Sequence, residues 1–212
     1  MAVPFSQFVR EQRLDLPILA TTKTCSGGTY IVTGANTGLG FETAKHLVRL
    51  QAIKVIIACR NTQAGERAKT EIETATGISN VAEVWAVDLA NYDSVKAFAK
   101  RAVDKLDRID ALIENAGVAL DQWVTAEGHE STITINVLGT LLLAVLLFPK
   151  LMDSAKRFNN LPHIVIVTSE VGFTVKPEFD KIKDDPLVRM DDQKLSDMAS
   201  RWYLRGDVLY GN

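Results

Sequence analysis

A glycine-rich segment near the start of the chain has the spacing expected of a phosphate-binding turn. Thr33–Gly40 reads Thr-Gly-Ala-Asn-Thr-Gly-Leu-Gly and lies between a predicted strand, 29–33, and a predicted helix, 41–50. Glycine lets the backbone approach a phosphate closely, and the first turn of a helix offers unpaired N–H donors. This context predicts a dinucleotide site rather than the alternative, an ordinary tight turn. The candidate contacts are Gly34, Asn36, Thr37, Gly38, Leu39 and Gly40.

A second position bears on which dinucleotide would bind. In the NAD fingerprint, an acidic side chain about 20 residues after the glycines contacts the ribose, whereas a nearby arginine accommodates the 2′-phosphate of NADP. Arg60 stands at that spacing from Gly40, between Cys59 and Asn61, so no carboxylate is available there. Because a guanidinium pairs well with phosphate, the sequence favours NADP (NADPH) over NAD. The alternative is a solvated arginine at the end of a strand.

The elements that must position these residues alternate along the chain. Short apolar, β-branched runs predict strands at 29–33, 54–59, 82–87, 111–113 and 163–167. Helical spacing of apolar residues predicts helices at 41–50, 62–76, 94–106 and 131–152. Apolar strands that alternate with helices are typical of a parallel sheet covered on both faces, with right-handed crossovers. The sequence therefore predicts a doubly wound, Rossmann-type α/β domain with five strands.

Further motifs follow the predicted strands, and together with the TGxxxGxG spacing they resemble the short-chain dehydrogenase/reductase family. They are Asp88-Leu89 after the third strand, Asn115-Ala116-Gly117 after the fourth, Asn136 on the long helix, and Ser169 after the fifth. The resemblance runs from about residue 28 to 172. Ile113–Gly117 and Leu161-Pro162 look most like a fungal, retinol-dehydrogenase-like branch, many members of which act in secondary metabolism.

The resemblance implies a role for each of these residues. Asp88 and Leu89 would contact adenine, and Asn115, Ala116 and Gly117 would complete the cofactor site. Ser169 would hold the substrate carbonyl, and Asn136 would order a water for proton transfer. Plainer roles stay open: a turn or helix cap for Asp88, a backbone-bonded helix residue for Asn136, and a loop cap for Ser169. All of them fall at the carboxyl edge of the sheet, where ligands of such folds bind.

The family's acid–base residue is where this sequence departs from the pattern. In the family a tyrosine protonates the substrate carbonyl, and a lysine four residues later lowers the pKa of that tyrosine. Tyr203 stands at the expected place, but Asp207 occupies the lysine position, and a neighbouring carboxylate raises a tyrosine pKa. No Tyr-x-x-x-Lys occurs after Ser169, and the sheet lacks the family's last strands. We expect a chain truncated at its C-terminus, a wrongly placed exon boundary, or a domain that keeps only the nucleotide half.

The composition of the chain excludes several other classes of protein. The 212 residues carry 24 Lys and Arg against 26 Asp and Glu, a near balance that argues against a nucleic-acid partner. The two cysteines, Cys25 and Cys59, show neither metal-type spacing nor a disulfide framework. The longest apolar stretch, 137–148, is shorter than the roughly 20 residues that span a bilayer. We therefore expect a cytoplasmic protein without a metal, and the resemblance adds a small-molecule substrate and a homodimer.

Three segments and three functions follow as expectations. Residues 1–26 form an N-terminal arm, 27–172 an NADP-binding domain, and 173–212 a loop and incomplete active-site helix that starts near Asp191–Leu195. The first function is an NADP-dependent ketoreductase or alcohol dehydrogenase for a small hydrophobic carbonyl or alcohol. The second is an NADP-binding pseudoenzyme or a stabilising partner of another reductase. The third is an isomerase or dehydratase that uses the same pocket.

Overall fold

The chain divides into two compact units. The computed structural model describes residues 9–10, 13–15, 17–120, 122–169, 180 and 183–193. One unit, called the sheet unit below, contains Ala20–Val118 and Thr132–Val167. The second unit contains Met1–Leu19, Ala119–Ser131 and Thr168–Asn212.

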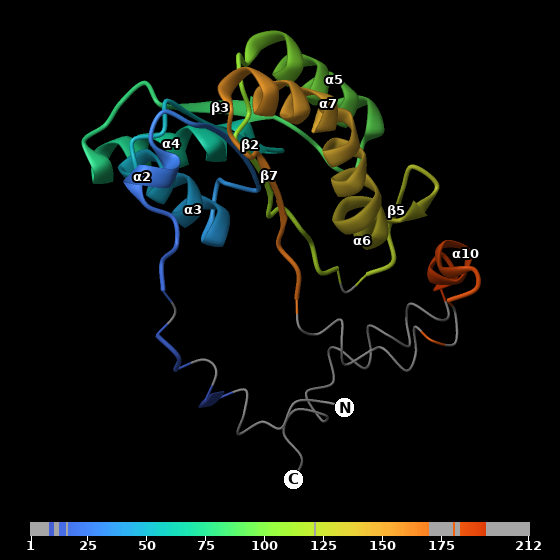
Figure 1. The fold of residues 1–212 in the computed structure, drawn as a ribbon. Coiled ribbons are helices and arrows are strands. Elements are labelled where there is room, and N and C mark those ends of the chain that lie inside the picture. The colour runs from blue at the N-terminus through green and yellow to red at the C-terminus, as the bar shows by residue number, and fades with distance from the viewer. Residues whose placement is uncertain are drawn as a thin grey trace. The chain divides into compact units, whose positions relative to one another are not determined.

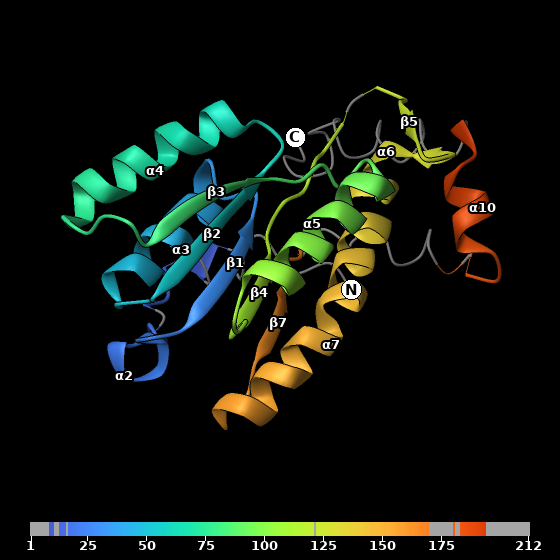
Figure 2. The ribbon, with the colours of Figure 1, turned by 90° about the horizontal axis from the view of Figure 1, so that it is seen from above.

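A five-stranded parallel sheet forms the centre of the sheet unit (Figures 1 and 2). Its strands are β1 (Thr29–Thr33), β2 (Lys54–Cys59), β3 (Ala82–Ala86), β4 (Ala111–Glu114) and β7 (His163–Ile166). They lie in the order β3-β2-β1-β4-β7, and every neighbouring pair is parallel. The prediction of a doubly wound α/β sheet is therefore confirmed. The strand order reverses between β1 and β4, which is the switch point where ligands bind in open sheets of this kind.

Helices cover both faces of this sheet, as Figure 2 shows. They are α3 (Gly38–Arg49) and α4 (Thr62–Thr76) on one face, and α5 (Tyr92–Lys105) and α7 (Thr140–Phe158) on the other. Successive strand residues point to opposite faces. Val32 of β1 accordingly packs in the core beneath α3 and α4, while its neighbour Ile31 packs beneath α5 and α7. The alternation of side chains along each strand thus forms two hydrophobic cores, one on each side of the sheet.

The long helix predicted over 131–152 is interrupted and extends further. Helix α6 (Ser131–Ile133) leads into a π-helical turn, η1 (Thr134–Gly139), and α7 then continues to Phe158. A Cβ atom on Gly139 would overlap the backbone oxygen of Leu89, so the backbone of η1 lies directly against the loop after β3. Such π turns occur frequently at functional sites.

Together, α6, η1 and α7 form a helix that is long and apolar enough to span a bilayer, whereas the apolar stretch 137–148 alone is too short. Ser131–Phe158 comprises 28 helical residues, and its most apolar window has a mean hydropathy of 2.1. Core helices of soluble proteins pass the same test of length and composition. Leu143, Leu147 and Leu151 of α7 are buried in the core of the sheet unit, as expected of such a core helix.

Among the described residues, four short elements have no counterpart in the predictions. Helix α2 (Thr22–Cys25) lies within the expected N-terminal arm, and the carbonyl oxygen of its buried Cys25 accepts a 3.0 Å hydrogen bond from the Tyr30 hydroxyl. In the second unit, β5 (Thr125–Ala126) and β6 (His129–Glu130) form an antiparallel pair. Helix α10 (Pro186–Met190) ends just before Asp191. The helix expected to start near Asp191–Leu195 would continue beyond residue 193, outside the described residues.

Among the described strands, β7 lies at one edge of the sheet and presents apolar side chains. Its hydrogen-bonded neighbour in the described part of the sheet is β4, and Ile164, Val165 and Ile166 are 38%, 44% and 42% exposed. Exposed apolar edges pair with other chains, whereas a lysine on the edge blocks such pairing. We therefore expect the 212-residue chain to associate as its concentration rises, and Val165→Lys to weaken that association. Light scattering after size exclusion measures this.

The matched control for the edge is Val103→Lys. Val103 is 43% exposed on α5, so the control adds the same charge at a similar exposure away from the edge. Association that responds equally to both substitutions, or a wild-type chain that is monomeric at every concentration, contradicts the prediction.

Candidate nucleotide site

A cavity of about 290 Å³ lies in the sheet unit, where the strands end at their carboxyl edge. Its walls come from the segments that follow β1, β2, β3 and β4, together with Ile135 of η1. The lining residues are Gly34, Asn36, Thr37, Ala58, Cys59, Arg60, Val87, Asp88, Leu89, Asn115, Ala116, Gly117, Val118 and Ile135. Every predicted cofactor contact is among them except Gly38, Leu39 and Gly40, which form the first turn of α3.

Thr33 joins the two strands that flank the switch point. Its hydroxyl oxygen accepts hydrogen bonds from the backbone N–H groups of Asn115 and Ala116, each at 3.0 Å. Its backbone oxygen accepts a third bond, at 3.1 Å, from the side-chain amide of Asn115. These bonds fix the loop after β4 against the end of β1 and so hold two cavity walls together.

The glycine turn brings the backbone unusually close to that loop. Gly34 has a φ of +66°, and a Cβ atom there would lie 2.9 Å from the Cα of Ala116. A Cβ on Gly40 would lie 2.5 Å from the Asn115 side-chain nitrogen and 2.7 Å from the backbone oxygen of Gly34. Only glycine therefore fits at these two positions, which lets α3 begin at the cavity wall.

The first turn of α3 is suited to an anion. Thr37 precedes the helix without forming a side-chain capping hydrogen bond, and the first turn contains no acidic residue. The first N–H groups of a helix have no partner within the helix and lie at the positive end of its dipole. This helix start can therefore receive a phosphate, as the sequence predicts.

Arg60 offers an exposed cation at the cavity. Arg60 follows β2, and the polar groups of its two neighbours already have hydrogen-bond partners. The Cys59 thiol donates to the Asn61 carbonyl at 3.3 Å, and the Asn61 side chain accepts from the Ala64 N–H at 3.0 Å. The arginine ion pairs of the described chain involve Arg108 and Arg157 and leave out Arg60. Its guanidinium can thus pair with an anionic ligand.

Asp88 combines a position in the cavity lining with a role in a turn. One carboxylate oxygen accepts the Ala90 N–H at 3.0 Å, and the Asp88 N–H donates to the Ser94 hydroxyl at 2.9 Å. The turn that leads into α5 is therefore built around this residue. The structure agrees with the plainer role considered for Asp88 and also places the residue at the cavity.

Asn136 binds the loop after β4 through both ends of its amide. Its oxygen accepts the Val118 N–H at 2.9 Å, and its nitrogen donates to the Val118 carbonyl at 2.8 Å. This reciprocal pair is the backbone-bonded role that the sequence left open, and it ties η1 to a residue of the cavity lining. The implied water-ordering role remains a prediction.

The other catalytic candidates lie outside the sheet unit or outside the described residues. Ser169 is exposed and belongs to the second unit, whereas the lining residues all belong to the sheet unit. Tyr203 and Asp207 lie outside the described residues. The roles of Ser169 and Tyr203 therefore stay predictions.

Sequence reasoning missed five lining residues: Ala58, Cys59, Val87, Val118 and Ile135. All are apolar or weakly polar, so their types carry no chemical signal. Each nevertheless lies within two positions of a residue that was predicted, at a strand end or on the long helix. Position at the carboxyl edge was the signal that could have found them.

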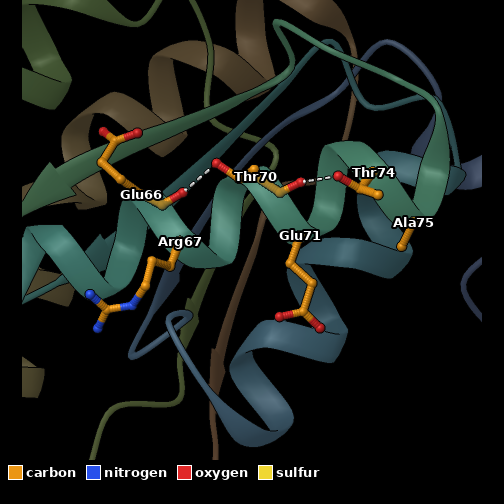
Figure 3. A pocket seen from close by; sticks show the side chains of 6 residues that line it. All are labelled: Glu66, Arg67, Thr70, Glu71, Thr74 and Ala75. Atoms are coloured by element: carbon orange, nitrogen blue, oxygen red, sulfur yellow. Dashed lines mark hydrogen bonds between the residues drawn. The ribbon is translucent and has the colours of Figure 1, made fainter.

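A second depression, of about 570 Å³, lies along α4 (Figure 3). Its six lining residues all come from that one helix, and none is a predicted site residue. The hydroxyls of Thr70 and Thr74 donate to the carbonyl oxygens one turn earlier, at 3.0 and 2.8 Å. These hydroxyls are thus bonded within the helix, and the predicted cofactor contacts that line a cavity line the smaller one.

The parallel sheet, the glycine turn and the cavity at the switch point define a Rossmann-type nucleotide-binding protein. Residues 29–180 match the family model described as short chain dehydrogenase. The chain belongs to the short-chain dehydrogenase/reductase family.

Relatives and solved structures agree with this membership. The chain is 48% identical over 155 residues to short chain dehydrogenase/reductase dmxR8 of Cryptosporiopsis sp. (strain 8999), covering 72% of this chain and 48% of the relative. It is 36% identical over 208 residues to short chain dehydrogenase atnD of Emericella nidulans, covering 94% and 65%. The chain thus spans less than two thirds of the length of either relative.

Among solved structures, a short chain dehydrogenase from Escherichia coli CFT073, described as complexed with NADPH, is similar to this chain. The TM-score is 0.59 and the sequence identity 25%, over 73% of this chain and 63% of that one.

Proposed function

We propose that this chain forms the nucleotide-binding part of an NADP-dependent short-chain oxidoreductase, a ketoreductase or alcohol dehydrogenase for a small hydrophobic carbonyl or alcohol. The observation that carries the proposal is the cavity lined by residues from the ends of four strands, with the first turn of α3 and Arg60 beside it. The NADPH complex of the similar E. coli protein supports the same cofactor.

The residues present fit NADPH. The close approach at Gly34 and Gly40 leaves room that a side chain would fill, and the first turn of α3 would hold the pyrophosphate. Arg60 would pair with the 2′-phosphate, and Asp88 and Leu89 would border the adenine. Asn115, Ala116 and Gly117 would position the remainder of the cofactor, which supplies a hydride when bound. The chain's own part is to bind and orient that cofactor.

The remaining proposals concern the setting of this reaction. The fungal origin of the relatives supports a fungal branch of the family. That this branch is retinol-dehydrogenase-like, and that the reaction belongs to secondary metabolism, is our proposal. We further propose a cytoplasmic location, a homodimer, and domain boundaries after residues 26 and 172. Ser169, Tyr203 and Asn136 are the proposed catalytic residues, although Asn136 already has Val118 as its hydrogen-bond partner.

Binding of NADPH followed by turnover on a panel of carbonyl compounds tests the function. NADPH fluorescence should report saturable binding, with consumption of NADPH on at least one carbonyl. Binding without turnover on any member supports the pseudoenzyme, and conversion of a compound without NADPH consumption supports an isomerase or dehydratase. Absence of NADPH binding contradicts both the oxidoreductase and the pseudoenzyme.

We expect turnover by the 212-residue chain to be weak, because Asp207 occupies the position of the family's lysine. General acid–base catalysis contributes about 10²–10⁴-fold, and a tyrosine whose pKa is not lowered forfeits most of that. Steady-state NADPH consumption should therefore fall well below the usual range of about 1–10³ per second. Turnover within that range contradicts the expectation. Tyr203→Phe then shows whether Tyr203 is the acid, with Tyr210 the alternative.

A further inference from the structure

Glu114 is a buried carboxyl group directly behind the nucleotide cavity. It ends β4, is 2% exposed, and neither carboxyl oxygen has a hydrogen-bond partner among the described residues. The next residues along the chain, Asn115, Ala116 and Gly117, line the cavity. A carboxyl group in such a place is expensive to ionise unless it is paired.

Among the described residues, the elements around Glu114 supply no charge to pair with it. Tyr30 of β1 and His163 of β7 both pair with Ala111, at the opposite end of β4. Glu114 shares a sheet face with Leu112, the face that α5 and α7 cover. The charged side chains of α5 are all exposed, η1 has no titratable residue, and the charges of α7 begin at Lys150. Asp88, at the cavity, carries the same charge as an ionised Glu114.

Burial therefore determines the ionisation of this group. Desolvation raises the pKa of Glu114 from 4.5 to about 8. The side chain is neutral at pH 7, and its ionisation falls in the mildly alkaline range.

Local opening at the end of β4 would let water solvate the ionised carboxylate. The backbone oxygen of Glu114 accepts the Val167 N–H at 2.9 Å, and the next two N–H groups bond to the Thr33 hydroxyl. Water that reaches the carboxylate has to separate some of these contacts. The same contacts hold the cavity wall formed by Asn115 and Ala116.

We propose that Glu114 is a pH-sensing positioning residue of the nucleotide site, whose neutral form keeps the end of β4 closed and whose ionisation loosens the cavity wall and weakens NADPH binding. The inference rests on the proposed function, since it takes NADPH to be the ligand.

NADPH affinity measured by fluorescence titration between about pH 7 and pH 9 tests the proposal. If the bound state accommodates only the neutral acid, wild-type affinity should fall about tenfold over this range. The 2′-phosphate, whose second pKa is near 6, is already ionised throughout. Burial raises the pKa of the Cys59 thiol, which also lines the cavity, and so shifts the ionisation of this thiol to higher pH.

Glu114→Gln keeps the shape of the neutral acid and cannot ionise. Its NADPH affinity should change less than about twofold over the same range, because no proton is linked to binding. Glu71→Gln on the exposed surface of α4 is the matched control and should follow the wild type. A flat wild-type profile, or a Gln variant that loses affinity as the wild type does, overturns the proposal.

Hydrogen exchange separates this proposal from the proposed function, because it needs no cofactor. Near pH 9 the segment 112–118 should exchange faster in the wild type than in Glu114→Gln, and equally near pH 7. Equal exchange at both values overturns the role of Glu114 even if NADPH binds. Faster exchange without any NADPH binding supports the role and refutes the function. Should the variant not fold, the wild-type exchange of 112–118 relative to β2 supplies the same comparison.

Discussion

Gly40→Ala is expected to lose most of the chain's affinity for NADPH. The added Cβ would lie 2.7 Å from the backbone oxygen of Gly34 and 2.5 Å from the Asn115 side-chain nitrogen. The asparagine is bonded to Thr33 at 3.1 Å, and the Gly34 oxygen is backbone, so neither can move without shifting the turn. Overpacking of this kind costs about 1–3 kcal/mol, which corresponds to a loss of roughly five- to 150-fold in binding.

Fluorescence titration measures that loss, and circular dichroism verifies that the variant is folded. Glu42→Ala is the matched control on the same helix: it removes the ion pair that the exposed Glu42 carboxylate makes with Lys45 and leaves the turn unchanged. The control should bind as the wild type does. A folded Gly40→Ala protein with wild-type affinity would show that the close approach of α3 to the turn does not matter for binding.

Asp110→Ala is expected to cost the largest amount of stability of any single substitution considered. Its carboxylate accepts the Thr29 N–H at 2.8 Å, the Arg108 Nε–H at 2.8 Å and the Asn160 amide at 2.5 Å, and it also pairs with the Arg108 terminal nitrogen. These bonds join β1 and β4 to the segment before β7 at the amino edge of the sheet. Removal leaves a partly buried guanidinium without its counter-charge, which typically costs about 3–5 kcal/mol.

Denaturant unfolding compares this substitution with Asp93→Ala. Asp93 is 92% exposed in its ion pair with Lys96, and such surface pairs contribute about 0–1 kcal/mol. The free energy of unfolding should therefore fall strongly in the first variant and little in the second. Equal changes in the two variants contradict the structural role assigned to the Asp110 network.

Features encoded locally were predictable from the sequence. Helix α4 begins and ends at the predicted residues because its signals are adjacent: Asn61 caps the first turn through Ala64, and Gly77 ends the helix with a φ of +70°. The glycine turn and Arg60 were found in the same way, since strand, turn and helix succeed one another within a few residues.

Features that depend on distant partners were not predictable. The amide of Asn136 is satisfied by Val118, which belongs to the loop after β4, and Gly139 meets the backbone of Leu89 across the fold. Neither contact leaves a periodic signal, so the π turn was read as a regular helix. The burial of Glu114 was not predictable either. A glutamate at a strand end suggests a solvated side chain, and its burial depends on how the sheet packs.

Titration of wild type and Arg60→Ala with NADPH and NADH tests the central claim, a site for NADP, most directly. A charge-assisted contact to the 2′-phosphate is worth about 1.5–3 kcal/mol, so the wild type should prefer NADPH by roughly ten- to hundredfold. Arg60→Ala should lose most of that preference while its NADH affinity stays nearly unchanged. Equal wild-type affinities for the two nucleotides, or a preference for NADH, would contradict the account.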